Sequence, residues 1–205
     1  MNKLRLLLVS CAMLLGAMVS QAEVRWGVTA VGNISTLNFN QQLFTVDQEF
    51  GYGAGLTGEI IIPGIGFAVD ASILYSQVGA TLHLGECTVW SSDGYGNERL
   101  NIHNIEIPLN LKFKYTNLNG VENTIAPLVY VGPTFAIHVA DNGVGAMDYS
   151  GGSFGLHVGA GCELIRRLQV SASYTWGITS TLETVKLDDF SAKNNYWRIS
   201  VSYMF

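Results

Sequence analysis

Charge and long apolar runs are both scarce in this sequence, which argues against an ordinary soluble domain and against a helical membrane protein. Charged residues make up 13% of the 205 residues, against about 25% in an ordinary soluble domain. Beyond residue 22 no apolar run reaches the roughly 17 to 25 residues that a helix needs to cross a bilayer. The net charge of −5 comes without a basic stripe, which argues against nucleic acid as a partner.

The first 22 residues have the pattern of a secretory signal peptide. Lys3 and Arg5 precede an apolar run over residues 6–19, and the small residues Ser20 and Ala22 occupy the two positions that define the expected cleavage site after Ala22. The run is too short for a transmembrane helix. Lipidation at Cys11 is a minor alternative, because the apolar run continues past that cysteine. We therefore predict a signal peptide over residues 1–22 and one domain over residues 23–205.

The remaining chain is apolar in a way that is typical of strands. Hydrophobic residues make up 48% of the sequence and the mean hydropathy is +0.26, but 23 glycines interrupt the apolar stretches. Alternation with a period of two recurs in eight segments, residues 24–34, 50–61, 66–84, 103–115, 127–139, 154–163, 168–178 and 196–205. Since backbone groups in lipid are satisfied only when the sheet closes on itself, we predict an all-β, eight-stranded antiparallel up-and-down transmembrane β-barrel over residues 23–205.

The last ten residues read as the strand that closes this barrel. Trp197, Ile199, Val201, Tyr203 and Phe205 share one face, and polar residues including Arg198 occupy the other. Aromatic residues at both ends of the apolar face match the two girdles of a membrane barrel. The terminal Tyr203 and Phe205 resemble the signal that bacterial outer-membrane barrels use for insertion, which implies the barrel-assembly machinery as a partner.

An even number of strands places both termini on the periplasmic side. Short connections at Pro63-Gly64 and Arg166-Arg167 then face the periplasm, and the longer ones, residues 35–49, 85–101, 141–153 and 179–195, face outward. A β-bulge is expected near Gln77, where the apolar positions change face, and at Pro108 and Pro133, which remove ladder donors. A secreted soluble barrel of the lipocalin kind would instead place its apolar face inside.

Eight charged residues fall on inward-facing strand positions, four of each sign: Arg25, Glu59, Asp70, Glu106, Lys112, Lys114, Glu163 and Arg198. An eight-stranded barrel is just wide enough for side chains to fill. We expect these groups to pair across the axis, with Glu106 and Arg198 in the outer half, and to leave no channel. The alternative is a solute pathway or proton site. Cys87 and Cys162 fall at opposite ends of their strands, so we expect no disulfide between them.

No catalytic, cofactor or metal site is predicted. His83 and His103 flank one outer hairpin with Cys87 nearby, which makes a surface metal site a minor alternative. Glu59 and Asp70 are expected to stay ionised beside cations rather than act as an acid–base pair. A lipid-modifying enzyme would need a His-Ser-acid set on the lipid face, and His103 has no serine two residues on.

Several motifs resemble the PorT-like porin family of outer-membrane barrel domains, and the architecture is similar to OmpX and OmpA. The motifs are residues 105–115 (IEIPLNLKFKY), 130–135 (YVGPTF), 159–163 (GAGCE) and 173–178 (SYTWGI). The resemblance implies an integral protein of the bacterial outer membrane, surrounded by lipid and lipopolysaccharide. It implies a structural or surface-interaction role in secretion or adhesion, without catalysis and with an unknown surface partner. A small-solute porin and an outer-membrane lipid-modifying enzyme are the alternatives.

Overall fold

The computed structural model describes residues 23–39, 43–62, 66–115, 124–142, 144, 147–184 and 191–205. The predicted signal peptide, residues 1–22, and the predicted Pro63-Gly64 turn lie outside the described residues. Among the residues described, no helix has the length and apolar character to cross a membrane.

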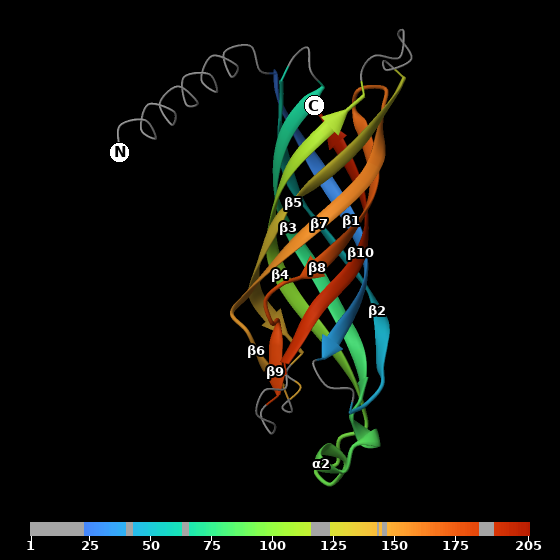
Figure 1. The fold of residues 1–205 in the computed structure, drawn as a ribbon, viewed down its shortest axis with the longest axis vertical. Helices are drawn as coiled ribbons and strands as arrows, with labels where there is room; N and C mark the ends of the chain where they lie inside the picture. Colours follow the sequence, from blue (N-terminus) through green and yellow to red (C-terminus); the bar gives the residue numbers. More distant parts are fainter. Residues whose placement is uncertain are drawn as a thin grey trace, which may run out of the picture.

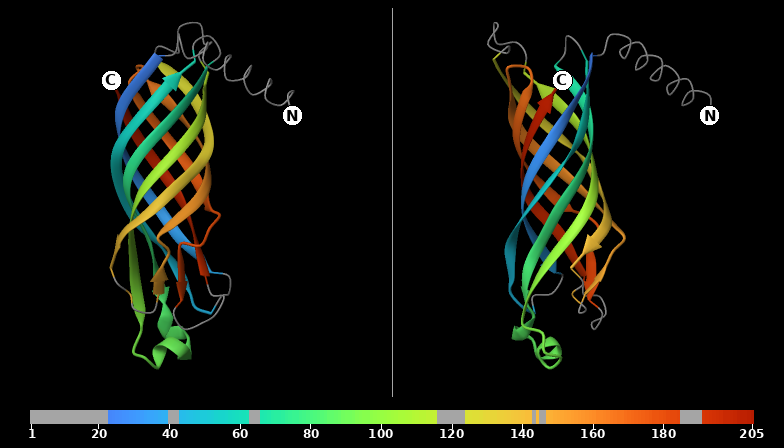
Figure 2. Two further views of the ribbon diagram at one scale, coloured as in Figure 1. Left: turned by 90° about the vertical axis from the view of Figure 1, so that its left-hand side faces the viewer. Right: turned by 180° about the vertical axis from the view of Figure 1, so that it is seen from behind.

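Eight long antiparallel strands close into a barrel, which confirms the predicted fold class. They are β1 (Glu23–Phe39), β2 (Val46–Ile61), β3 (Phe67–His83), β4 (Asn97–Lys114), β5 (Ile125–Asp141), β7 (Gly152–Leu164), β8 (Leu168–Gly177) and β10 (Ser191–Met204). Each pairs with the next, and β10 closes the barrel on β1 from Gly27↔Met204 to Phe39↔Ala192. The first residues of β1 and the end of β10 lie at the same end of the barrel, which we call the inner end (Figures 1 and 2).

Smaller elements gather at the opposite, outer end. Between β3 and β4 the chain forms a 3-10 turn, η1 (Leu84–Glu86), and one turn of helix, α2 (Thr88–Ser91). Two short strands, β6 (Met147–Tyr149) and β9 (Leu182–Thr184), extend the sheet in the order β10-β9-β6. Figure 1 shows α2 at the tip, beyond the strands. None of these elements was predicted, because each is too short to leave a periodic pattern.

The alternation of faces is clear in β10. Trp197 is 57% exposed on the outside, whereas Arg198 is 6% exposed on the inside. The same period runs through β1, where Trp26 and Val28 face out and Arg25 and Thr29 face in. Outward apolar residues can meet lipid, while inward polar residues fill the lumen.

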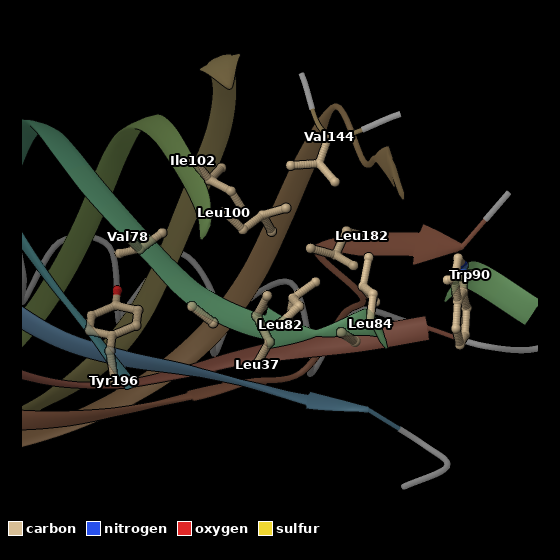
Figure 3. Packing of buried hydrophobic residues seen from close by; sticks show 12 residues of the cluster. Leu37, Val78, Leu82, Leu84, Trp90, Leu100, Ile102, Val144, Leu182 and Tyr196 are labelled. Atoms are coloured by element: carbon tan, nitrogen blue, oxygen red, sulfur yellow. The ribbon is translucent and has the colours of Figure 1, made fainter. Parts of the chain in front are cut away.

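The strands continue past the outer ends predicted for them, and their two faces exchange character there. β1 ends at Phe39 rather than Ile34, and β4 begins at Asn97 rather than His103. In this extension most inward side chains are apolar, and with side chains from the outer connections they form a buried cluster, the outer plug (Figure 3). Its members are Leu37, Val78, Ala80, Leu82, Leu84, Trp90, Leu100, Ile102, Val144, Leu182, Ala192 and Tyr196.

The β-bulge predicted within β3 near Gln77 lies instead in the facing strand, because the β2–β3 register shifts by one residue between Gln48↔Ala80 and Gly53↔Ser76. Val78 and Leu82 share the inward face of β3 with Asp70, and β3 pairs with β4 without a register shift from Phe67↔Phe113 to His83↔Asn97. The even-numbered positions of β3 face inward along the whole strand. The apolar residues move to these positions at Val78 because the lumen itself is apolar at that height. Register shifts do occur between Gln48 and Gly53 in β2, and between His103 and Asn104 where β4 pairs with β5.

The bulges predicted at Pro108 and Pro133 are wrong as well. The β3–β4 pairing is interrupted beside Pro108, between Ala71↔Leu109 and Leu74↔Glu106, but it resumes in the same register. Pro133 pairs with Leu156 in an unshifted β5–β7 ladder. The missing backbone N–H of a proline therefore interrupts the hydrogen-bond ladder locally, but no extra residue is inserted into the strand.

Candidate functional site

The inner half of the lumen holds one connected set of ion pairs, the inner charge network, made of Arg25, Glu59, Asp70, Lys112, Lys114 and Glu163. Glu59 is 0% exposed and lies 3.0 Å from Lys112 Nζ, 2.6 Å from Lys114 Nζ and 3.6 Å from Arg25 Nη1. Lys112 Nζ also lies 2.5 Å from Asp70, and Lys114 Nζ lies 2.7 Å from Glu163.

Electrostatics and hydrogen bonding explain why six buried charges can coexist. Three cations face three carboxylates, so the network is neutral. Gln169 fills the space between the carboxylates, donating to Glu163 at 2.7 Å and accepting from Lys112 at 2.9 Å. Because removal of one partner would strand a buried charge at a cost of about 3 to 5 kcal/mol, we expect the network to open rarely.

A second ion pair, the outer pair, lies higher in the lumen. Arg198 Nη2 lies 2.7 Å from Glu106 Oε2, and Arg198 Nε donates to Asn33 Oδ1 at 2.8 Å. Tyr196 donates its hydroxyl to the same Glu106 oxygen at 3.1 Å, and its ring lies 4.8 Å from the guanidinium carbon. The structure thus brings all eight inward charges into pairs, six in the inner network and two here.

Small hydroxyl side chains occupy the space between these two layers. Thr29 lies 2.6 Å from Thr57 and 2.7 Å from Ser202, and Thr57 lies 2.8 Å from Ser72, so one chain of hydroxyls crosses four strands. They border a polar cavity of about 60 Å³. This layer was not predicted, although short hydroxyl residues at inward positions between the bulky charges indicate it in the sequence.

His157 lines the same cavity and is held by hydrogen bonds. Its Nε2 is bonded to Asn110 Oδ1, and Asn110 Nδ2 donates to Asp70 at 2.6 Å. This chain of hydrogen bonds ties one wall of the cavity to Asp70 of the inner charge network. His157 Nε2 therefore has a hydrogen-bond partner within the lumen.

The outer plug closes the lumen above the outer pair. Leu82, Leu84 and Leu100 are fully buried there, and Figure 3 shows them among the labelled side chains of the cluster. Trp90 of α2 is fully buried, and its ring centroid lies 5.4 Å from that of Phe44. The connection between β3 and β4 is therefore anchored to the barrel rather than loose above it.

The structure separates the residues of the alternative metal site. His83 Nε2 lies 2.9 Å from Asp47, whereas His103 Nδ1 lies 2.9 Å from the hydroxyl of Tyr75. In the β3–β4 register His83 pairs with Asn97, but His103 pairs with Gln77. Among the described residues, no group of three or more His, Cys, Asp or Glu side chains is placed to hold a metal.

The other expectations concern the cysteines and the terminal aromatics. Cys87 follows η1 at the outer end, Cys162 lies near the inner end of β7, and both are free thiols. Phe205 donates its backbone N–H to Trp26 at 2.7 Å, and its ring centroid is 5.8 Å from that of Tyr203. The predicted insertion residues thus lie at the β1–β10 seam, on the lipid-facing side.

Comparison with known proteins supports this geometry. The family model described as outer membrane protein beta-barrel domain matches residues 6–205, and no curated protein matches the chain. OprG from Pseudomonas aeruginosa is 13% identical with a TM-score of 0.53, covering 90% of this chain and 95% of OprG. Ail of Yersinia pestis is 14% identical with a TM-score of 0.47, covering 89% and 99%. The outer membrane enzyme PagL is 10% identical with a TM-score of 0.43, covering 84% and 98%.

OprG shares the fold, and the likeness to the other two is too weak to carry an argument. The family match, by contrast, spans nearly the whole chain and agrees with the closed barrel, the outward apolar face and the inward polar one. The protein therefore belongs to the outer membrane protein beta-barrel domain family and is a bacterial outer-membrane β-barrel.

Proposed function

We propose that this barrel is a closed, non-catalytic structural or surface-interaction protein of the outer membrane, acting through its outer end in secretion or adhesion. Membership of the PorT-like group within the family is part of this proposal. The observation that carries it is the double closure of the lumen, first by neutralised ion pairs and then by the outer plug.

The two closures oppose conduction by different physical means. A solute entering from the inner end must break pairs that share Glu59, which strands buried charge. An ion that passes them then meets buried leucines such as Leu82 and Leu100, where it loses its hydration without compensating contacts. The cavity between the layers measures only about 60 Å³.

The outer end has the features of a presented surface. β3 and β4 continue past their last outward apolar residues, Tyr75 and Ile105, and the buried Trp90 fixes α2 at the tip. Polar and charged side chains occupy the outward positions there, including His83 and Arg99. A rigid scaffold lowers the entropy lost when a partner binds.

Planar bilayer recording tests the closed lumen. The wild-type protein should show no stable conductance, whereas a variant with Leu82→Ser and Leu100→Ser should leak more often because it loses the apolar closure but keeps every ion pair. Steady, ion-selective channels from the wild-type protein would overturn the proposal in favour of a small-solute channel. A changed acyl pattern in co-reconstituted lipopolysaccharide would overturn the non-catalytic part.

Cross-linking on intact outer membranes tests the interaction role. Because Gly85 N–H donates to Gly96 O at 3.0 Å, residues 86–95 can be replaced by a short turn without separating β3 from β4. Capture of the same partner by the wild-type and the shortened protein would show that this tip is not the contact surface. Heat-modifiable migration on gels verifies that the shortened barrel is folded.

A further inference from the structure

Two glycines leave a gap among the inward side chains near the outer ends of β7 and β8. Gly155 of β7 shares the inward face with His157, and Gly177 of β8 shares it with Thr175. The two glycines are direct partners in the β7–β8 ladder, and Gly155 pairs with Thr134 of β5 on its other side. The lumen therefore gains space at this height, because two neighbouring inward positions carry no side chain.

A small cavity of about 20 Å³ lies at this gap. Its lining includes the two glycines, Thr134 of β5, Asn194 of β10 and Thr181, which directly precedes β9. One water molecule needs about 10 to 15 Å³ of such space. The cavity thus has room for one molecule of that size.

Three oxygen atoms of this lining are buried without a hydrogen-bond partner among the described residues. They are Thr134 Oγ1, Thr181 Oγ1 and Asn194 Oδ1. The three residues are only 5%, 5% and 8% exposed. An unpaired buried polar atom costs the free energy of its lost hydration. Three such atoms around one cavity therefore point to a ligand that bonds to all of them.

The chemistry of the three atoms selects the ligand. Each threonine hydroxyl can donate a hydrogen, whereas Asn194 Oδ1 only accepts. A water molecule suits this set, because it can accept from both hydroxyls and donate to the amide oxygen, and about three bonds are usual for a buried water. A metal cation could not accept the hydroxyl hydrogens. Its charge would also be unbalanced, since Glu106 of the same lining is already paired with Arg198 at 2.7 Å.

We propose that this cavity binds one structural water, which joins β5, β10 and the connection between β8 and β9. The backbone of Thr181 is held at both sides, because its N–H donates to Ala192 O at 2.8 Å and its carbonyl accepts from Ser150 N–H at 3.0 Å. The water adds a link from the Thr181 side chain to the barrel wall. It thereby fixes the base of β9, on which β6 pairs. This inference does not depend on the proposed surface role.

Isosteric substitution tests the site through the sign of its effect. Thr134→Val and Thr181→Val each exchange a hydroxyl for a methyl group of similar size. If the water bonds to the hydroxyl, each variant loses one hydrogen bond, and the equilibrium constant for unfolding in urea should rise about fivefold. If the hydroxyl has no partner, the methyl group removes an unsatisfied polar atom, and stability should be unchanged or higher, which would overturn the site. Thr36→Val, at an outward position of β1, is the control and should leave the constant close to that of the wild type.

Further measurements test whether one water is shared. The variant with both Thr134→Val and Thr181→Val should lose less stability than the sum of the two single losses, because a water displaced by the first change cannot be displaced again. Additive losses would overturn a shared ligand. A high-resolution crystal structure of the wild-type protein should show a water bonded to all three oxygen atoms. Lower stability after sodium chloride is replaced by choline chloride would identify a cation as the ligand and overturn the water.

Discussion

Replacing Arg198 with alanine is the sharpest test of how the lumen is stabilised. The change removes the bond from Nη2 to Glu106 at 2.7 Å, the bond from Nε to Asn33 at 2.8 Å and the contact with the Tyr196 ring. Glu106 keeps only the Tyr196 hydroxyl among these partners. Breaking a buried pair from one side costs about 3 to 5 kcal/mol.

The structure favours the lower end of that range. Arg198 borders the 60 Å³ cavity, so water can follow the shortened side chain and partly rehydrate Glu106. We therefore expect Arg198→Ala to lower the free energy of unfolding by about 3 kcal/mol. Replacing both partners, as Arg198→Met with Glu106→Gln, should cost clearly less than the single change, because no charge is then left alone.

Urea unfolding in phospholipid vesicles, followed by tryptophan fluorescence, measures this difference. The matched control is Arg99→Ala, which removes an exposed arginine bonded to Glu49 and should cost about 1 kcal/mol or less. If Arg198→Ala costs no more than Arg99→Ala, the outer pair is not a buried constraint. A double variant less stable than the single one would refute the charge-stranding argument itself.

Four further expectations follow from other parts of the barrel. The folded protein should migrate differently on gels before and after heating, and fractionation as soluble periplasmic material would contradict a membrane barrel. Deleting Phe205 should slow assembly and leave periplasmic aggregates, because the seam loses its bond to Trp26; normal assembly rates would argue against the insertion signal. Trp90→Ala should cost about 3 to 5 kcal/mol in urea unfolding because it empties a fully buried site, and an unchanged midpoint would show that α2 is not anchored. The hydrogen bond with Asp47 raises the pKa of His83, so this contact stabilises the outer ends of β2 and β3 below about pH 6.5 and is lost as the pH rises through the raised pKa. An NMR titration should show the His83 midpoint falling in Asp47→Asn, and an unmoved midpoint would exclude the contact.

The barrel itself could be predicted because its determinant is local. Lipid outside and a polar lumen inside impose a period of two on every spanning segment, and Trp197, Ile199 and Val201 against Arg198 show it within a few residues. Strand count and the shared side of the termini then follow from connectivity. No long-range information was needed.

The pairing of charges could be predicted only in part. Arg198 and Glu106 were expected to meet because they were the two inward charges in the outer half, and the structure places them together. The pairs within the inner charge network could not be predicted in this way, because six charged groups at similar depth allow many different pairings. That Lys112 bridges Glu59 and Asp70, whereas Lys114 bridges Glu59 and Glu163, depends on strand stagger.

The outer plug is the feature that the period of two did not predict, and the unshifted β3–β4 register shows why a bulge in β3 was the wrong explanation. Along β3, which runs from the inner to the outer end, the inward positions become apolar at Val78. Along β4, which runs back from the outer to the inner end, they become polar after Ile102. Val78 and Ile102 are direct partners in the β3–β4 ladder, as are the outward, polar Gln77 and His103. A bulge would displace one strand against the other, whereas an inversion at matched positions in two strands marks a change in the surroundings. We therefore expect the wall to pass from lipid to water at this height, and the residues beyond it form the outer surface that we propose is presented to a partner.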